Sequence, residues 1–269
     1  MSRFGVDYSD GRPSTNALKA AGVTFVVRYL SGGTSKDLTA NEARSLSQAG
    51  IDIAVVWETT ATRAEAGYDA GVNDARRALA QGIQLGLPAG RPIYFAVDED
   101  TTVGPNITGY FNGVSSVVGI ERTGVYGGYD VVRGCFDASL ATFGWQTYAW
   151  SRGQWDSRAQ LQQYHNGAPT IDGVQCDSDR AVQDDFGQWR VGGAVAQPPE
   201  DDGVVKALQR AVHVSPDGIW GPATDAALQA VRSGQTVRAI QAALGVAVDG
   251  SWGPQTDQAF LTARSNFHG

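Results

Sequence analysis

The feature that most constrains the fold is a regular alternation, between residue 3 and about residue 190, of short β-rich runs and longer runs with helical spacing. Such an alternation is typical of βα units arranged around a parallel sheet. Several of the short runs are almost continuously apolar, as expected of strands buried on both faces. Eight units predict an α/β fold built on a closed (β/α)8 TIM-like barrel. The eight expected strands are Arg3–Tyr8, Thr24–Leu30, Ile51–Trp57, Pro92–Val97, Thr123–Tyr126, Gln146–Ala149, Gln160–Tyr164 and Gly173–Cys176.

The stretches between these strands carry helix signals. The run from Thr39 to Ala49 begins with a capping box, in which Thr39 is the expected N-cap and Glu42 follows three residues later. The segment from Arg63 to Leu85 also has helical spacing over its length. Because about 190 residues is short for a complete barrel, we expect one or two reduced helices late in the ring.

The chain beyond the barrel repeats itself. The run Val205-Lys-Ala-Leu-Gln matches Val237-Arg-Ala-Ile-Gln, and Asp217-Gly-Ile-Trp-Gly-Pro-Ala-Thr-Asp matches Asp249-Gly-Ser-Trp-Gly-Pro-Gln-Thr-Asp, both at an offset of 32 residues. Each unit predicts a helix, an Asp-Gly turn and a second helix that begins at proline. We therefore expect a barrel domain in residues 1–190, a Pro- and Gly-containing linker in 191–203, and a small all-α domain of two packed repeats in 204–269.

Composition narrows the function. The formal net charge of −7 is opposite to that of a nucleic-acid binder, so we expect no nucleic-acid partner. Two cysteines and three histidines provide neither a disulfide framework nor zinc-ligand spacing, so no metal site or cofactor is expected, and a zinc amidase is disfavoured. The longest apolar runs are far too short to span a bilayer, and the sequence contains no recognisable signal peptide, so we expect no membrane partner.

Carboxylates follow the expected strands at the end where barrel enzymes place their active sites. Strand alternation would put Asp98 and Asp100 on one face and Glu99 on the other. A concave site with several carboxylates suits glycoside hydrolysis, in which one carboxylic acid protonates the leaving oxygen and a second carboxylate acts as nucleophile or base. For any single residue, a helix-capping role at a βα turn remains the alternative. The candidate carboxylates are Asp7, Glu58, Asp98, Asp100 and Asp177.

Other side chains are expected to line the same cleft. Tyr126 and Trp150 would form aromatic walls, and Arg28 in the second strand would lower the pKa of a neighbouring carboxyl group. His165 is interpreted as a rim or packing residue rather than the base of a serine triad. Cys135 and Cys176 are interpreted as small core residues.

The barrel segment resembles a known family through four motifs. The chain is similar there to the glycoside-hydrolase-like domain long labelled domain of unknown function 1906, a relative of the family 25 lysozymes that is frequent in actinobacteria and their phages. The resemblance covers residues 3 to 186 and implies a (β/α)8-like barrel. The motifs are Gly5-Val6-Asp7-Tyr8, Phe25-Val26-Val27-Arg28-Tyr29-Leu30, Val56-Trp57-Glu58 and Pro92-Ile93-Tyr94-Phe95-Ala96-Val97-Asp98.

The resemblance also implies roles for individual residues. Asp7, Asp98 and Asp177 match the first-strand, fourth-strand and eighth-strand acids of the lysozyme pattern. That pattern has Glu two residues after the fourth-strand Asp, where this chain has Asp100. Glu58 is therefore the expected general acid and Asp100 the alternative. Asp98 would be the charged partner or nucleophile, Asp7 and Asp177 would hold sugar or water, and the cleft would be lined by Arg28, Trp57, Tyr126, Trp150 and Gln163.

The C-terminal repeats resemble the peptidoglycan-binding type 1 modules through the motifs Val-x-x-Leu/Ile-Gln and Asp-Gly-x-Trp-Gly-Pro-x-Thr. Trp220 and Trp252 occupy equivalent turns. Each ring either packs beneath its own turn or stacks on the sugars or peptide stems of the wall.

These observations together predict a monomeric peptidoglycan hydrolase. Like a lysozyme, it would cleave the glycan between N-acetylmuramic acid and N-acetylglucosamine, and its C-terminal module would bind it to the cell wall. A phage endolysin of an actinobacterial host is the expected setting, with accumulation in the host cytoplasm and holin-mediated release to the cell wall. The alternative is a non-catalytic wall-binding protein with a degenerate glycosidase barrel, which the Asp100 departure favours.

Overall fold

The computed structural model describes residues 2–192, 202–214, 216, 220–231 and 235–267. The chain divides into two compact units, Met1–Val195 and Ala196–Gly269. Residues 193–201, which make up most of the expected linker, lie outside the described residues. Residues 217–219, which contain the expected Asp217-Gly218 turn of the first repeat, also lie outside them.

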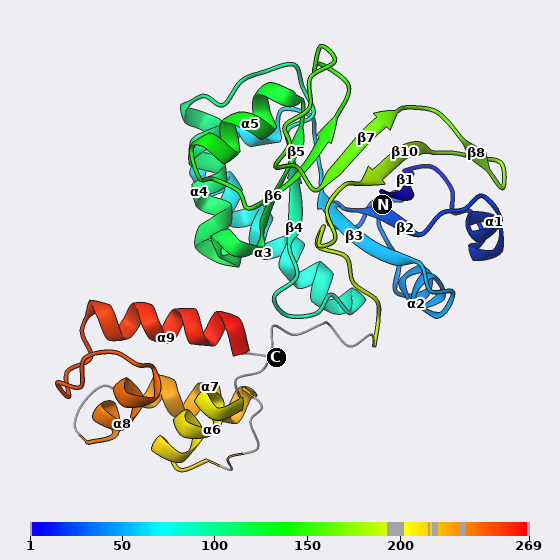
Figure 1. The fold of residues 1–269 in the computed structure, drawn as a ribbon. Helices are drawn as coiled ribbons and strands as arrows, with labels where there is room; N and C mark the ends of the chain where they lie inside the picture. Colours follow the sequence, from blue (N-terminus) through cyan, green and yellow to red (C-terminus); the bar gives the residue numbers. More distant parts are fainter. Residues whose placement is uncertain (1, 193–201, 215, 217–219, 232–234, 268–269) are drawn as a thin grey trace. The chain divides into compact units, whose positions relative to one another are not determined.

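Eight strands of the first unit close into a barrel (Figure 1). Their order around the barrel is β1-β10-β7-β6-β5-β4-β3-β2. Seven of them lie within one to three residues of the expected strands, because each contains a run of apolar or β-branched residues. The strands are β1 (Arg3–Asp7), β2 (Phe25–Leu30), β3 (Asp52–Trp57), β4 (Ile93–Ala96), β5 (Thr123–Gly127), β6 (Phe143–Thr147), β7 (Leu161–His165) and β10 (Asp177–Ala181).

The barrel is mixed rather than all-parallel, which corrects the expected (β/α)8 arrangement. Strand β10 runs antiparallel to both of its neighbours, β1 and β7, while the other neighbouring pairs are parallel. The expected eighth strand at Gly173–Cys176 is also wrong. Its residues Val174–Gln175 (β9) pair instead with Thr170–Ile171 (β8) in a separate hairpin. The true eighth strand has the polar sequence Asp-Ser-Asp-Arg-Ala, because its inward positions carry carboxylates rather than apolar side chains.

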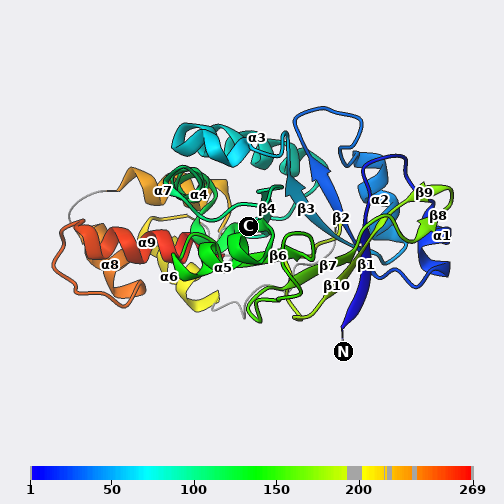
Figure 2. The same cartoon turned by 90° about the horizontal axis from the view of Figure 1, so that it is seen from above.

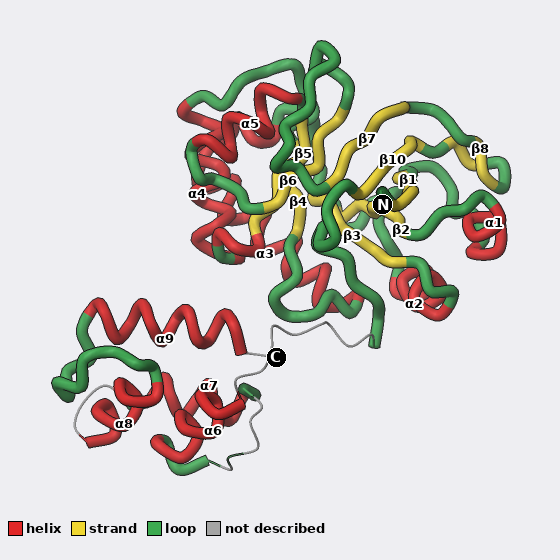
Figure 3. The backbone as a smooth tube through the Cα atoms, viewed as in Figure 1, coloured by secondary structure: helices red, strands yellow, loops and turns green. Residues whose placement is uncertain are grey.

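Helices cover only part of the barrel (Figures 2 and 3). The Thr39 hydroxyl accepts a hydrogen bond from the Glu42 backbone N–H, which confirms the expected cap of α2. Within residues 2–192 no helix separates β6 from β7 or β7 from β10, so the ring is incomplete in its last third, as expected. The helices are α1 (Thr15–Ala20), α2 (Ala40–Gln48), η1 (Arg63–Ala66), α3 (Gly67–Leu85), α4 (Pro105–Val118), η2 (Ile120–Arg122) and α5 (Tyr129–Asp137).

Two apolar layers stabilise this unit. The outer layer lies between the strands and the helices and contains Cys135 and Cys176, both free and buried, which confirms their interpretation as core residues. The inner layer fills the barrel with aromatic and aliphatic side chains, among them Phe25, Tyr94 and Trp145. The fit there is tight, since a Cβ at Gly5 would lie 2.4 Å from Cζ of Phe25. The barrel interior is therefore a packed core with polar groups confined to one end.

The described residues of the second unit form four helices, α6 (Asp202–Ala211), α7 (Pro222–Ala230), α8 (Gln235–Ala243) and α9 (Pro254–Phe267). The 32-residue repeat is visible in its contacts. Gln209 and Gln241 donate to the hydroxyl groups of Thr224 and Thr256, and the two tryptophan Nε1–H groups each donate to an aspartate five residues later. Both second helices begin at the expected proline.

Candidate active site

The side chains that point inward at the carboxyl ends of the parallel strands are mostly polar. Alternation along each strand brings Asp7 (β1) and Gln163 (β7) into the barrel, and the residues just after β3 and β4, Glu58 and Asp98, continue the same inward rows. Strand β10 contributes Asp177, which lies opposite Asp7 in the antiparallel register. Five residues expected at the site from sequence thus come from five different strands to one end of the barrel.

Asp7 and Gln163 form the centre of one hydrogen-bond network. Asp7 is buried, and its two oxygens accept hydrogen bonds from the Tyr29 hydroxyl at 2.8 Å and from Nε2 of Gln163 at 2.8 Å. The Gln163 amide oxygen in turn accepts from the hydroxyl of Tyr126 at 2.9 Å. Burial, followed by the nearby charge of Asp177, raises the pKa of Asp7 to about 7. Tyr126 and Gln163 therefore lie at the site, as the sequence predicts.

Asp177 and Asp179 lie on the β10 side of this network. Asp177 accepts hydrogen bonds from the Gly167 backbone N–H at 2.6 Å and from Nε2 of Gln163 at 3.3 Å. Burial raises its pKa, partly offset by the Gly167 hydrogen bond. Asp179 is fully buried one inward position deeper and accepts from the indole N–H of Trp145 at 2.8 Å. This side of the site therefore contains three acidic side chains within one strand pair.

The opposite side is formed by Glu58, Asp98 and Lys36. The Lys36 ammonium contacts Glu58 Oε1 at 2.6 Å and lies 4.9 Å from the centre of the Tyr29 ring. Burial and then the charge of Glu58 raise the pKa of Asp98, and Lys36 acts in the opposite direction. Lys36 therefore forms an ion pair with Glu58, while the pKa of Asp98 is raised by its surroundings. These contacts favour Asp98 as the acid and Glu58 as its charged partner, the reverse of the roles expected from sequence.

Asp100, the expected alternative acid, is exposed to solvent. Strand β4 ends at Ala96, so the alternation that would align Asp100 with Asp98 does not continue. The Asp100 side chain is 60% exposed and its nearest cationic contact is Arg152 at 3.8 Å. The structure therefore separates Asp100 from the buried carboxylates.

Arg28 and Trp57 point outward from their strands, which corrects their expected position in the cleft. Tyr29 and Glu58, their chain neighbours, face inward, so alternation directs Arg28 and Trp57 to the outer face. Trp57 is 1% exposed in the layer beneath the helices, where Arg77 of α3 lies 5.1 Å from the ring centre.

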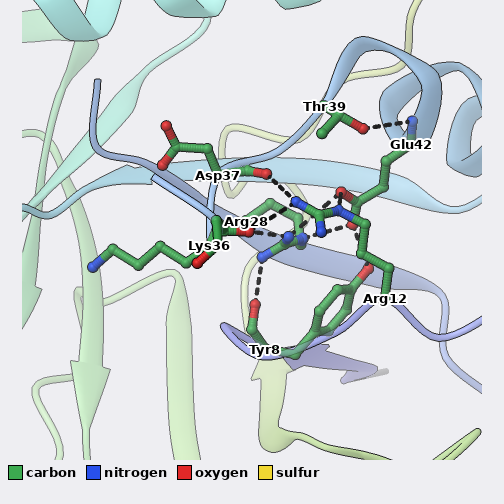
Figure 4. A network of polar contacts seen from close by, with 8 residues as sticks. Tyr8, Arg12, Arg28, Lys36, Asp37, Thr39 and Glu42 are labelled. Carbon is green, nitrogen blue, oxygen red and sulfur yellow. Dashed lines mark hydrogen bonds and ion pairs between the residues drawn. The ribbon is translucent and has the colours of Figure 1, made fainter. Parts of the chain in front are cut away.

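The buried guanidinium of Arg28 organises two loops next to the site (Figure 4). It donates to Glu42 Oε1 at 2.7 Å, to the Lys36 carbonyl at 3.1 Å and to the Tyr8 carbonyl, and it lies over the Tyr8 ring. Glu42 also accepts from Arg12 and from the Tyr8 hydroxyl. Burial alone would raise the pKa of Glu42, but Arg28 and these hydrogen bonds outweigh it and lower the pKa. Arg28 thus supports the loop that carries Lys36 rather than contacting a carboxylate of the site.

Trp150 lies in the loop after β6, with 36% of its surface exposed and a left-handed backbone at φ 58°. A non-glycine residue in this region is strained and such strain is often found at binding sites. Its Cβ lies beside Gly128, where a Cβ would be only 3.3 Å away. Among the described residues, no hydrogen bond, ion pair or ring contact joins Trp150 to the buried carboxylates, so its place in a cleft stays a prediction.

The second-unit tryptophans differ in exposure. Trp220 is completely buried and packs against Phe260, so its ring is a core element and not a surface for sugar stacking. Trp252 is partly exposed and contacts the same Phe260 ring with centres 5.3 Å apart. The structure thus leaves only Trp252 partly accessible.

Two site residues were missed by the sequence reasoning. Tyr29 occupies an inward position that alternation along β2 could have found, whereas Asp179 lies two residues after the candidate Asp177 and on the same face of β10. Lys36 reaches the site from a loop, and nothing in its local sequence indicates that placement. Among the described residues, no group of three or more histidine, cysteine or acidic side chains is arranged to hold a metal ion. In the same part of the chain, no helix is long and apolar enough to cross a membrane.

A closed barrel with several acidic side chains gathered at one end is the arrangement expected of a glycoside hydrolase-like protein. The chain matches the family model described as "Rv2525c-like, glycoside hydrolase-like domain" over residues 16–181, well over half of its length. It therefore belongs to the Rv2525c-like family of glycoside hydrolase-like domains, which also confirms the broad resemblance found in the sequence.

Individual relatives agree with this assignment. The Mycobacterium tuberculosis protein named "Putative peptidoglycan hydrolase Rv2525c" is 30% identical over 200 residues, which cover 68% of this chain and 82% of the relative. The crystal structure of that Tat-secreted protein with L-tartrate has a TM-score of 0.66 and 28% identity, covering 70% of this chain and 98% of that one. An uncharacterized B. stearothermophilus protein shares the fold, with a TM-score of 0.52, 16% identity, and coverage of 67% of this chain and 96% of that one.

Proposed function

We propose that this protein is a peptidoglycan hydrolase whose barrel cleaves the glycan between N-acetylmuramic acid and N-acetylglucosamine. The observation that carries the proposal is the pairing of Asp98, whose pKa is raised by burial and by Glu58, with a Glu58 carboxylate that contacts Lys36 at 2.6 Å. Glycoside hydrolysis requires such a pair, one group able to donate a proton and one that stays charged. Membership of the family and the name of the mycobacterial relative support the same substrate class.

Each carboxylate has a role in this proposal. Asp98 protonates the leaving glycosidic oxygen, and Glu58 acts as nucleophile, base or stabiliser of the positively charged transition state. Asp7 and Asp177, on the other side of the barrel end, bind sugar hydroxyl groups or the attacking water. The positive charge of Lys36 offsets part of the negative charge of Glu58 near Asp98, so it limits the rise of the Asp98 pKa that burial and Glu58 cause.

The second unit is proposed to bind the cell wall. Tethering a binding unit to the barrel would raise the local concentration of the hydrolase at its insoluble substrate. We further propose action at the wall of an actinobacterial host, reached from the host cytoplasm by holin-mediated release, as in a phage endolysin. A fragment that starts near Gly203 should then pull down with purified walls without cutting them, and loss of that binding would refute the targeting role.

The decisive experiment measures new reducing ends and new free amines after incubation of the full chain with actinobacterial peptidoglycan. Reducing ends should appear without free amines. Asp98→Asn should lower the rate by about 10² to 10⁴, as is typical for loss of a general acid. Asp100→Asn is the matched control, since this exposed aspartate only two residues away should be dispensable. Equal rates in wild type and Asp98→Asn would refute the assignment.

The second candidate is a barrel that binds glycan without cleaving it. The specific observation in its favour is that Asp100, which occupies the position of the usual glutamate, is exposed and lies near Arg152. In that case the same assay would yield no reducing ends, while the full chain would still pull down with walls. Asp7→Asn would then weaken the binding.

A further inference from the structure

The most unusual side chain of the barrel is Asp179, because only one of its two oxygens has a donor. Asp179 is fully buried, and Oδ1 accepts from the Trp145 indole N–H at 2.8 Å. Within the described residues, no N–H or hydroxyl group donates to Oδ2, which is also buried. A buried carboxylate oxygen without a donor is costly, whereas the O–H of a neutral carboxylic acid needs only an acceptor.

The acceptor is available on the neighbouring strand. Antiparallel pairing sets Gly5 opposite Asp179 and Asp7 opposite Asp177, so Asp7 and Asp179 are diagonal neighbours on the inner face. This placement brings the Asp179 carboxyl group within reach of Asp7, and each of the two groups affects the pKa of the other. A hydrogen bond between the two groups needs a proton on one of them, because two ionised carboxylates have no proton to donate.

The direction of the bond follows from the other partners of Asp7. Both Asp7 oxygens already accept, one from the Tyr29 hydroxyl and one from the Gln163 amide. Asp7 is thus surrounded by donors, and Asp179 Oδ2 has none. The arrangement is satisfied when the proton resides on Asp179 and points to Asp7.

The surrounding groups offer no cation to replace that proton. The titratable groups that face Asp179 are Asp7, Asp177 and Tyr94, and none of the ion pairs among the described residues includes Asp7, Asp177 or Asp179. Arg180, next in the chain, points outward and donates to Gln162. The space below is occupied by the Phe25 ring, against which Gly5 packs.

We propose that Asp179 is a neutral carboxylic acid throughout the neutral pH range and donates its Oδ2 proton to Asp7, which makes it a positioning residue for Asp7. Burial, and then the neighbouring Asp7, raise the pKa of Asp179 well above its ordinary range. The shared hydrogen bond lowers the pKa of Asp7, so Asp7 is the member of the pair that loses its proton first. The pair therefore carries at most one negative charge in the neutral range.

The relevance of this pair to turnover rests on the proposed function, but its protonation can be measured without activity. The infrared spectrum of the full chain at about pH 8, where ordinary carboxyl groups are ionised, should contain the carbonyl band of a protonated carboxyl group. Asp179→Asn should abolish the band, and the Asp98→Asn control should retain it. A wild-type spectrum without the band, or a band whose intensity is unchanged in Asp179→Asn, would overturn the proposal whether or not the protein cleaves peptidoglycan.

A second variant, Asp179→Leu, tests the proposed hydrogen bond from Asp179 to Asp7. Its comparison with Asp179→Asn separates loss of this bond from a folding defect. Asn at 179 can still donate to Asp7 and accept from Trp145, so the pH profile of glycan cleavage should stay close to that of wild type. Leu at 179 removes the donor, and the apparent pKa of Asp7 should then rise by roughly one pH unit, because a hydrogen bond to its charged form is lost. Far-ultraviolet circular dichroism establishes that each variant is folded. Identical profiles for Asp179→Leu and Asp179→Asn would refute the positioning role.

Discussion

Replacement of Asp7 by Asn should stabilise the protein above neutral pH, although Asp7 lies in the candidate active site. Burial and Asp177 raise the Asp7 pKa from its ordinary value of 3.8 to about 7. The unfolded chain thus releases this proton near pH 4, while the folded chain retains it until about pH 7. Over that window the folded state binds more protons, so the free energy of unfolding decreases as pH rises.

The size of the effect follows from the two pKa values. At about 1.4 kcal/mol per pH unit, the rise from 3.8 to about 7 corresponds to roughly 4 kcal/mol of lost stability at pH 8. Asn cannot ionise and avoids this loss. It has only one acceptor oxygen for the donors Tyr29 and Gln163 and for the proposed Asp179 proton, which costs about 1 kcal/mol at every pH. Asp7→Asn should therefore be about 1 kcal/mol less stable than wild type near pH 4 and about 3 kcal/mol more stable near pH 8.

Urea unfolding of both proteins at several pH values between about 4 and 8 measures this difference directly. Asp100→Asn serves as the control, because its exposed side chain should give the same offset from wild type at every pH. The reasoning fails if the difference between Asp7→Asn and wild type is constant across the range, or if it has the opposite slope.

Four further substitutions test the packing of the two units. Glu42→Gln leaves the guanidinium of Arg28 buried without its anion and should cost about 3 to 5 kcal/mol in urea unfolding; a cost below about 1 kcal/mol would contradict a buried ion pair. Gly5→Ala places a methyl group against the aromatic core and should lower the melting temperature with a loss of about 1 to 3 kcal/mol, whereas an unchanged melting temperature would mean that the core yields easily. In the second unit, Trp220→Ala should destabilise by about 3 to 5 kcal/mol and Trp252→Ala by clearly less, because only the first ring is fully buried; equal losses would argue against that difference.

The sequence was sufficient to predict most of the barrel because its strands are apolar. In β2 and β3 both faces are buried, so nearly every residue is apolar and the strand is evident. Strand β10 could not be recognised in this way, since its inward residues Asp177 and Asp179 belong to the site. The functional residues removed the hydrophobic pattern by which the strand would have been identified.

The site acids could be predicted where an acidic residue directly follows an apolar strand. They could not be predicted where the direction of the side chain depends on the residue at which the strand ends. Asp7, Glu58 and Asp98 follow apolar runs and point inward as expected. Asp100 does not, because β4 ends four residues earlier. The expected position of Arg28 in the cleft was wrong. Strand alternation gives the observed direction, because an inward Tyr29 requires its chain neighbour Arg28 to point outward.

The two sides of the site differ in how negative charge is compensated, and this difference suggests a division of labour. On the β3–β4 side, Lys36 compensates Glu58 directly. On the β1–β10 side, none of the ion pairs among the described residues involves Asp7 or Asp177; burial raises the pKa of both groups, and His165 opposes that rise for Asp177. Environments that separate the protonation of neighbouring acids are the usual way in which one site supplies both an acid and an anion.

This asymmetry leads to a last prediction. Lys36→Met removes the cation that opposes the rise in the Asp98 pKa, so the decline of cleavage at alkaline pH should move to higher pH. Asp177→Asn removes a negative charge that raises the Asp7 pKa, so a limb of the profile governed by Asp7 should move to lower pH. Complete pH profiles of kcat/KM for the two variants measure both shifts. Shifts in the same direction would show that the two sides titrate as one cluster, and the division of labour would then be wrong.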